Sequence, residues 1–85
     1  MYFLATGILT DPSQISPGQH EEETRVLTGL REQGLVREAF RKADGPGVIS
    51  ILQAPTLQEA QAQMSTLPFV TLGLLSFEYT ELLEL

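Results

Sequence analysis

The sequence predicts one α+β domain over residues 1–85, with the element order β-α-β-β-α-β. Three observations favour this class. The length of 85 residues suits one domain and leaves no room for a second. The hydrophobic fraction of 42% and the charged fraction of 19% are typical of a globular chain. Short apolar runs rich in strand-forming residues alternate with two segments that carry helix-capping signals.

The first half of the chain begins with a strand and a helix. Residues 2–9 form an apolar, strand-forming run that ends at an Asp-Pro-Ser turn signal. Ser16 is suited to cap a helix, Pro17 suits its first position, and Gln19 completes a capping box. Gly34 is the expected stop. The pattern therefore predicts a helix from residue 17 to about residue 33.

The second half reads as two strands, a helix and a last strand. Residues 35–42 have strand character, a glycine-rich turn follows, and residues 48–52 form the clearest strand of the chain. Thr56 caps the second helix, with Glu59 three residues later. Its apolar positions recur at spacings of three and four: Leu57, Ala60, Met64 and Leu67. The last strand is expected over roughly residues 71–80.

This element order is typical of a ferredoxin-like fold, a four-stranded antiparallel sheet with two helices on one face. A sheet with one face in water should alternate apolar and polar residues. The first and last expected strands instead carry apolar residues on both faces: Tyr2, Leu4 and Ile8 against Phe3, Ala5 and Leu9, and Leu72 and Leu74 against Leu75, Phe77 and Tyr79. Two helices cover only one face, so we expect a homodimer or larger homo-oligomer formed through the sheet.

Composition narrows the function classes. The net charge of −6 argues against nucleic-acid binding. The chain has no cysteine, which excludes disulfides and thiolate metal sites. It lacks a long apolar stretch and a basic leader, so we expect a cytoplasmic protein without a membrane span. All five basic residues fall within 25–42, whereas residues 46–85 hold four glutamates and no base. Such a basic stripe is either an anion site or solvated surface.

Several segments resemble the muconolactone isomerase group of the dimeric α+β barrel superfamily. The segments that carry this resemblance are residues 34–45, 48–52 and 66–69. Residues 45–54, Glu59-Ala60, Pro68-Phe69 and Gly73-Leu74 are also similar to YciI-like proteins of the same superfamily. The resemblance implies a dimer or larger ring, a cleft between helices and sheet, and proton transfer on an anionic lactone acid without a cofactor. Its motifs are mostly glycines and apolar positions, which identify a fold better than an activity.

Arg37 and Arg41 are the part of this pattern with chemical content. They lie four apart on an expected strand, which places both on one face with Ala39 between them. Two guanidinium groups on one face suit a carboxylate ligand, because each offers a planar fork of donors. Alternatively, they pair with Glu38, Asp44 or acidic residues of a partner at a sheet edge.

His20, the only histidine, precedes Glu23 by three residues on the first helix. An imidazole and a carboxylate there are able to move a proton, as isomerisation of an unsaturated acid requires. The resemblance adds that Glu23 falls at a position that is acidic in the family. Alternatively, Glu21, Glu22 and Glu23 complement the helix dipole.

Glu78 and Ser76 interrupt the last apolar strand and share one of its faces. A carboxylate that faces a closed cavity would have a raised pKa and serve as an acid or base, with Ser76 helping to orient a ligand. Alternatively, Glu78 lies near a strand end and pairs with an arginine. The chain has no Gly-x-Ser-x-Gly elbow of a serine hydrolase and no phosphate loop, and its one histidine makes a poor metal site.

Two function classes remain open. One is a cofactor-free isomerase or lyase that acts on a small organic acid or lactone, with His20, Glu23 and Glu78 as catalytic residues and Arg37, Arg41 and Ser76 as ligand-binding residues. The other is a non-catalytic small-molecule binder or assembly module of the same superfamily. The first needs a titrating group in a pocket, whereas the second needs only the pocket.

Overall fold

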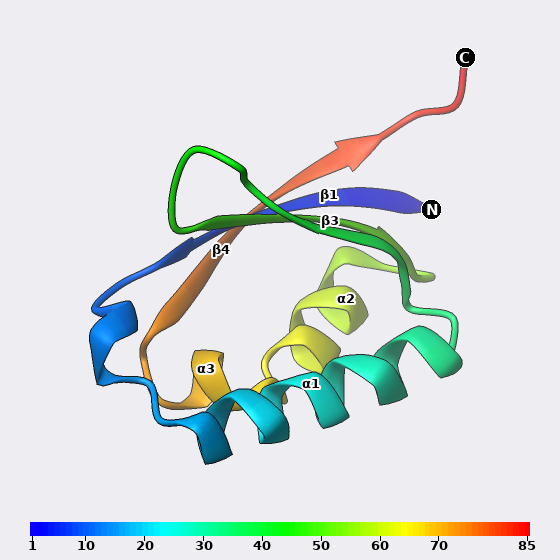
Figure 1. Ribbon diagram of the computed structural model, residues 1–85. Coiled ribbons are helices and arrows are strands. Elements are labelled where there is room, and N and C mark those ends of the chain that lie inside the picture. The colour runs from blue at the N-terminus through cyan, green and yellow to red at the C-terminus, as the bar shows by residue number, and fades with distance from the viewer.

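Four strands form one antiparallel sheet in a computed structural model that describes residues 1–85. The strands are β1 (Tyr2–Leu9), β2 (Val36–Arg41), β3 (Gly47–Gln53) and β4 (Leu75–Leu82). Their order is β2-β3-β1-β4, so β2 and β4 are the two edges. The helices are η1 (Pro12–Gln14), α1 (Pro17–Glu32), α2 (Leu57–Met64) and α3 (Pro68–Thr71). All three α-helices lie on one side of the sheet (Figure 1), which confirms the predicted fold class.

The capping signals in the sequence act as expected. The Gln19 backbone N–H donates to Ser16 Oγ at 3.2 Å, and the Ser16 N–H donates to Gln19 Oε1 at 2.8 Å. Thr56 accepts from the Glu59 N–H at 3.1 Å and so caps α2. Gly34 ends α1 with a φ of 86°, a left-handed conformation that glycine adopts without a Cβ clash. Local hydrogen bonding therefore sets the ends of both long helices.

The region around Pro68 differs from the prediction. Helix α2 ends at Met64, the short helix α3 covers Pro68–Thr71, and β4 starts only at Leu75 rather than near residue 71. Pro68 stands in the first turn of α3, where its fixed φ favours a helix and its missing N–H costs nothing. Gly73, with a φ of 75°, then turns the chain into β4.

The hydrophobic core lies between the sheet and the helices. Its largest fully buried side chains are Phe3, Leu52 and Met64, from β1, β3 and α2. Gly7 leaves space for this packing, because a Cβ there would lie 2.7 Å from both Phe77 Cε1 and Val48 Cγ2. Such a distance is too short for a carbon–carbon contact.

The opposite, open face of the sheet carries no helix. Alternation along the strands places seven apolar or aromatic side chains on it: Tyr2, Leu4, Ile8, Phe40, Ile49, Ile51 and Leu82. Ile8 is 59% exposed and Phe40 58% exposed. From Ser76 to Thr80 the outward residues of β4 are polar (Ser76, Glu78, Thr80), so the prediction of two apolar faces for the last strand was wrong. Most of the apolar open face belongs to β1, β2 and β3.

Candidate functional site

The contact between α1 and α3 contains the most unusual carboxyl group of the chain. The Phe69 backbone N–H donates to Glu23 Oε1 at 2.9 Å, which ties the middle of α1 to the first turn of α3. Phe69 is buried and Glu23 is half-buried. Burial raises the pKa of Glu23 above 4.5 and outweighs the opposing effects of the Phe69 N–H and of His20.

The second carboxylate oxygen of Glu23 is accessible. No hydrogen bond involves Oε2, and the chain contains no buried side-chain oxygen without a partner. Oε2 therefore keeps solvent-accessible surface. The carboxyl group is thus held by one oxygen and available through the other.

His20 lies on the same side of α1 as Glu23. Its ring is 5.5 Å from the Phe69 ring, centroid to centroid, at an interplanar angle of 82°. This edge-to-face contact is a favourable aromatic geometry. The structure therefore brings His20 and Glu23 together around Phe69, one through its ring and one through its carboxylate. The helix-dipole alternative fits less well, because the first turn of α1 contains no acidic residue.

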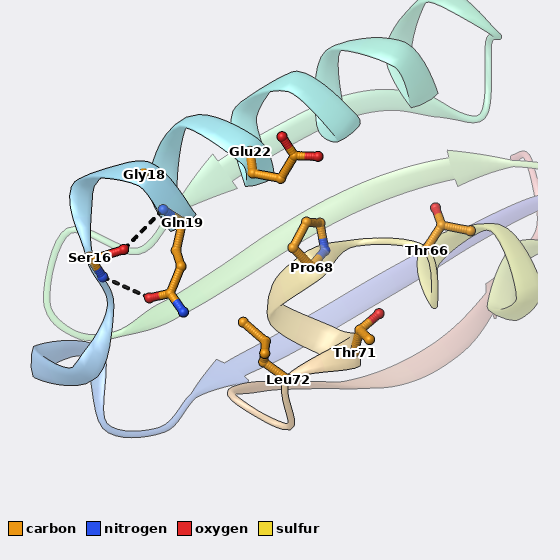
Figure 2. A pocket seen from close by; sticks show the side chains of 8 residues that line it. All are labelled: Ser16, Gly18, Gln19, Glu22, Thr66, Pro68, Thr71 and Leu72. Atoms are coloured by element: carbon orange, nitrogen blue, oxygen red, sulfur yellow. Dashed lines mark hydrogen bonds between the residues drawn. The ribbon is translucent and has the colours of Figure 1, made fainter.

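An open cleft of about 560 Å³ lies between the N-terminal half of α1 and the segment around α3. Figure 2 shows Gln19 and Glu22 on α1 across from Pro68, Thr71 and Leu72. Ser16, Gly18 and Thr66 complete the lining. Four of the eight lining residues are both exposed and polar: Ser16, Glu22, Thr66 and Thr71. Sequence reasoning did not select Thr66 or Thr71, because nothing in the pattern indicated that α3 would bring them beside α1.

The predicted arginine pair is not formed. A β-bulge between Val36 and Glu38 inserts one residue into β2, so the simple alternation that put Arg37 and Arg41 on one face was wrong. Arg37 Nη1 donates to Gln53 Oε1 at 2.8 Å, and Gln53 belongs to the open face. Arg41 is opposite Val48, on the helix side. Neither arginine pairs with an acidic residue of the chain, since Glu22–Arg25 is its only ion pair.

Ser76 and Glu78 share the open face, as expected from their spacing. Both are exposed and lie on the edge strand β4, so Glu78 does not face the closed cavity that its acid–base role would require. The six predicted site residues therefore occupy three places: His20 and Glu23 beside α3, Arg37 and Arg41 on β2, and Ser76 and Glu78 on β4.

The arrangement of strands and helices agrees with a solved structure of muconolactone isomerase. The two superpose with a TM-score of 0.81 over 99% of this chain and 90% of that chain, at 18% sequence identity. The fold is that of muconolactone isomerase. The sequence resemblance is thus confirmed at the level of the fold, and the similarity to YciI-like proteins stays a prediction.

A second neighbour is the 5-chloro-2-hydroxyhydroquinone dehydrochlorinase of Burkholderia phenoliruptrix AC1100, solved with 2,5-dihydroxybenzoquinone. Its TM-score is 0.79, with 16% identity over 96% of this chain and 93% of that chain. No protein-family model matches the chain, and no curated protein matches it in sequence. No group of three or more histidine, aspartate or glutamate side chains is placed to hold a metal ion. None of the helices is both long and apolar enough to cross a membrane.

Proposed function

We propose that this chain is a cytoplasmic, muconolactone isomerase-like protein that moves a proton on a small organic acid or lactone without a cofactor. The fold supports the proposal, since both neighbours are named for reactions of small oxygenated ring compounds. In this reaction a base removes a proton from a carbon beside a carbonyl group. The proton then returns at another carbon, so no other reactant is consumed.

The observation that carries the proposal is the half-buried Glu23 carboxyl with its raised pKa. A general base works better as its pKa approaches the working pH, and burial shifts the pKa of Glu23 upward in that direction. Phe69 fixes one oxygen of the carboxyl, and the other remains open to a ligand. We assign Glu23 as the base and His20, against the Phe69 ring, as the group that relays the proton.

The other four predicted site residues contribute less directly to the proposed reaction than Glu23 and His20 do. Arg37 and Arg41 each offer an unpaired guanidinium to an acid, although not as one clamp. Ser76 and Glu78 lie on the face of the sheet opposite α1, so within one chain they cannot share a ligand with Glu23, and they would act only toward a ligand or partner chain on that face. We therefore include the homodimer in the proposal.

A non-catalytic binding or assembly module is the second candidate. The separation of the six predicted residues into three places favours it, because a single active site would gather them. The exposed apolar sheet face also favours an assembly role.

Proton exchange into solvent tests the catalytic proposal. The protein is incubated in D₂O with muconolactone and a panel of small unsaturated acids, and deuterium at carbon is followed by NMR. We expect exchange by the wild type, loss in Glu23→Gln, and wild-type exchange in the control Glu21→Gln, which changes an exposed carboxylate of the same helix. No exchange with any compound, or equal exchange by Glu23→Gln, would contradict the proposal and leave the binding module.

A further inference from the structure

The side-chain amide of Gln19 has a fixed orientation at the cleft between α1 and α3. The Ser16 backbone N–H donates to Gln19 Oε1 at 2.8 Å, and a backbone N–H is only able to donate. The amide oxygen is therefore the atom bonded to Ser16, and Nε2 lies on the other side. Figure 2 shows this nitrogen on the side that faces Leu72, which also lines the cleft. No hydrogen bond within the chain uses its two hydrogens.

The other polar side chains that line the cleft do not offer a fixed donor. Thr66 and Thr71 donate their hydroxyl hydrogens to backbone carbonyl groups, at 2.6 Å and 3.3 Å. Glu22 has no hydrogen to donate, and an arginine of the same helix binds its carboxylate. The hydroxyl hydrogen of Ser16 turns about its C–O bond and has no fixed direction. Gln19 is therefore the side chain of the lining whose N–H donors are both free and fixed.

Gln19 lies one helical turn before Glu23, the base of the proposed reaction. Side chains four residues apart share one face of a helix, with their Cβ atoms about 5–6 Å apart. Both residues face α3, because Gln19 lines the cleft with Pro68, and the next residue, Phe69, donates its backbone N–H to Glu23 at 2.9 Å. A small ring compound is long enough to span one helical turn, so one ligand is able to reach both side chains.

We propose that Gln19 is a catalytic residue, whose Nε2 hydrogens bind the oxygen that becomes negative when Glu23 removes a proton from the substrate. The inference rests on the proposed function and adds the group that stabilises its intermediate. Glu23 takes the proton from a carbon beside a carbonyl group, the C–H electrons form a C=C bond, and the carbonyl oxygen becomes an enolate oxygen. Return of the proton at another carbon restores the carbonyl group. A donor that is fixed before the reaction needs no reorientation, which favours strong stabilisation of such an oxyanion.

Two variants remove the donor in different ways. Gln19→Glu keeps an acceptor for the Ser16 N–H, so it keeps the helix cap and loses the N–H donors. Gln19→Leu removes the donors without adding charge, but it loses the cap hydrogen bond. In the D₂O exchange assay with muconolactone, both variants should lower kcat about 100-fold, the usual effect of removing one oxyanion donor. Gln19→Glu should keep the wild-type midpoint of urea unfolding.

Each variant has a matched control away from the cleft. Gln58→Glu adds the same charge in the first turn of α2. Thr56→Ala removes the side-chain acceptor of the Glu59 N–H and so destabilises a helix end, as Gln19→Leu does. Both controls should keep the wild-type kcat, because neither residue lines the cleft.

NMR of the side-chain amides observes the donor directly. The chain contains seven glutamines and no asparagine, so the pair of NH₂ signals that disappears in Gln19→Glu belongs to Gln19. The probe is 4-nitrophenolate, a flat oxyanion whose charge is delocalised as in an enolate. It should shift the Gln19 pair downfield more than any other pair. Its neutral methyl ether, 4-nitroanisole, should not.

The outcomes separate this inference from the proposed function. If Glu23→Gln loses exchange but both Gln19 variants keep the wild-type kcat, the donor role is wrong and the proposed function stands. Equal losses in Gln19→Leu and Thr56→Ala, with Gln19→Glu active, would assign the effect to the helix cap and also overturn the donor role. If the wild type exchanges no compound, the proposed function falls and the amide shift decides the donor role. A Gln19 pair that 4-nitrophenolate does not shift overturns the role in every case.

Discussion

Replacing Glu23 with alanine should destabilise the fold by a defined amount. The variant removes the only acceptor of the Phe69 N–H, at the start of α3. Leaving a buried donor unpaired costs about 1–3 kcal/mol, and this contact is only partly buried, so we expect about 1–2 kcal/mol. Each kcal/mol corresponds to roughly 4–8 °C in Tm for a domain of this size. Urea unfolding at fixed protein concentration measures the loss.

The glutamine variant separates the hydrogen bond from the charge. Glu23→Gln keeps an acceptor for the Phe69 N–H and removes the ionisation. Because burial raises the pKa of Glu23 in the folded chain above its ordinary value of 4.5, the folded state binds this proton more tightly than the unfolded state does. The stability that this proton contributes is fully present below pH 4.5 and is lost as the pH rises through the folded pKa.

Comparison of the variants with the wild type removes the contributions of the other acidic groups. The unfolding free energy of Glu23→Gln minus that of the wild type should increase as the pH rises from 4.5 through the raised pKa of Glu23 in the folded chain. The control Glu21→Ala, on the exposed side of α1, should change stability by less than about 0.5 kcal/mol. A glutamine variant as unstable as the alanine variant, or a difference that does not vary with pH, would refute the reasoning.

Three further perturbations test the assembly, the packing and the ligand. If folding is coupled to dimerisation, the Tm should rise with protein concentration, and a constant Tm over a wide range in calorimetry would exclude that coupling. Gly7→Ala should cost about 1–3 kcal/mol in urea unfolding, because its Cβ has no room, whereas Gly29→Ala, with open space in α1, should add up to about 1 kcal/mol; equal effects would contradict the packing argument. Titration calorimetry with small carboxylic acids should show binding lost in Arg41→Ala and partly kept in Arg41→Lys, and equal binding by all three proteins would exclude Arg41 as a ligand residue.

The fold was predictable because its signals are local. The capping box at Ser16 and Gln19, the cap at Thr56 and the apolar run of β1 each act within a few residues. Short-range hydrogen bonds and side-chain periodicity define these elements without reference to distant segments. The start of β4 was misplaced because Pro68 fits both the end of one helix and the first turn of another.

The candidate site was less predictable, because it depends on contacts between distant segments. Glu23 contacts Phe69, which lies 46 residues away, and no local pattern indicates that contact. The grouping of Arg37 with Arg41 failed for a different reason. It assumed regular alternation, and a single bulge residue reverses the face of everything beyond it. The sequence of β2 carries no turn or glycine signal at that bulge.

The uneven distribution of charge along the chain acquires a spatial arrangement only through the strand order. Bases confined to residues 25–42 and acids without bases in residues 46–85 are only a polarity along the chain. The strand order β2-β3-β1-β4 converts that polarity into a basic edge and an acidic edge of one sheet. An arginine that binds a ligand would lose its partner when the ligand is removed, whatever the protein concentration. An arginine that pairs with another chain loses its partner on dilution, and the protein concentration at which dissociation begins should rise with the salt concentration, because salt screens the pair.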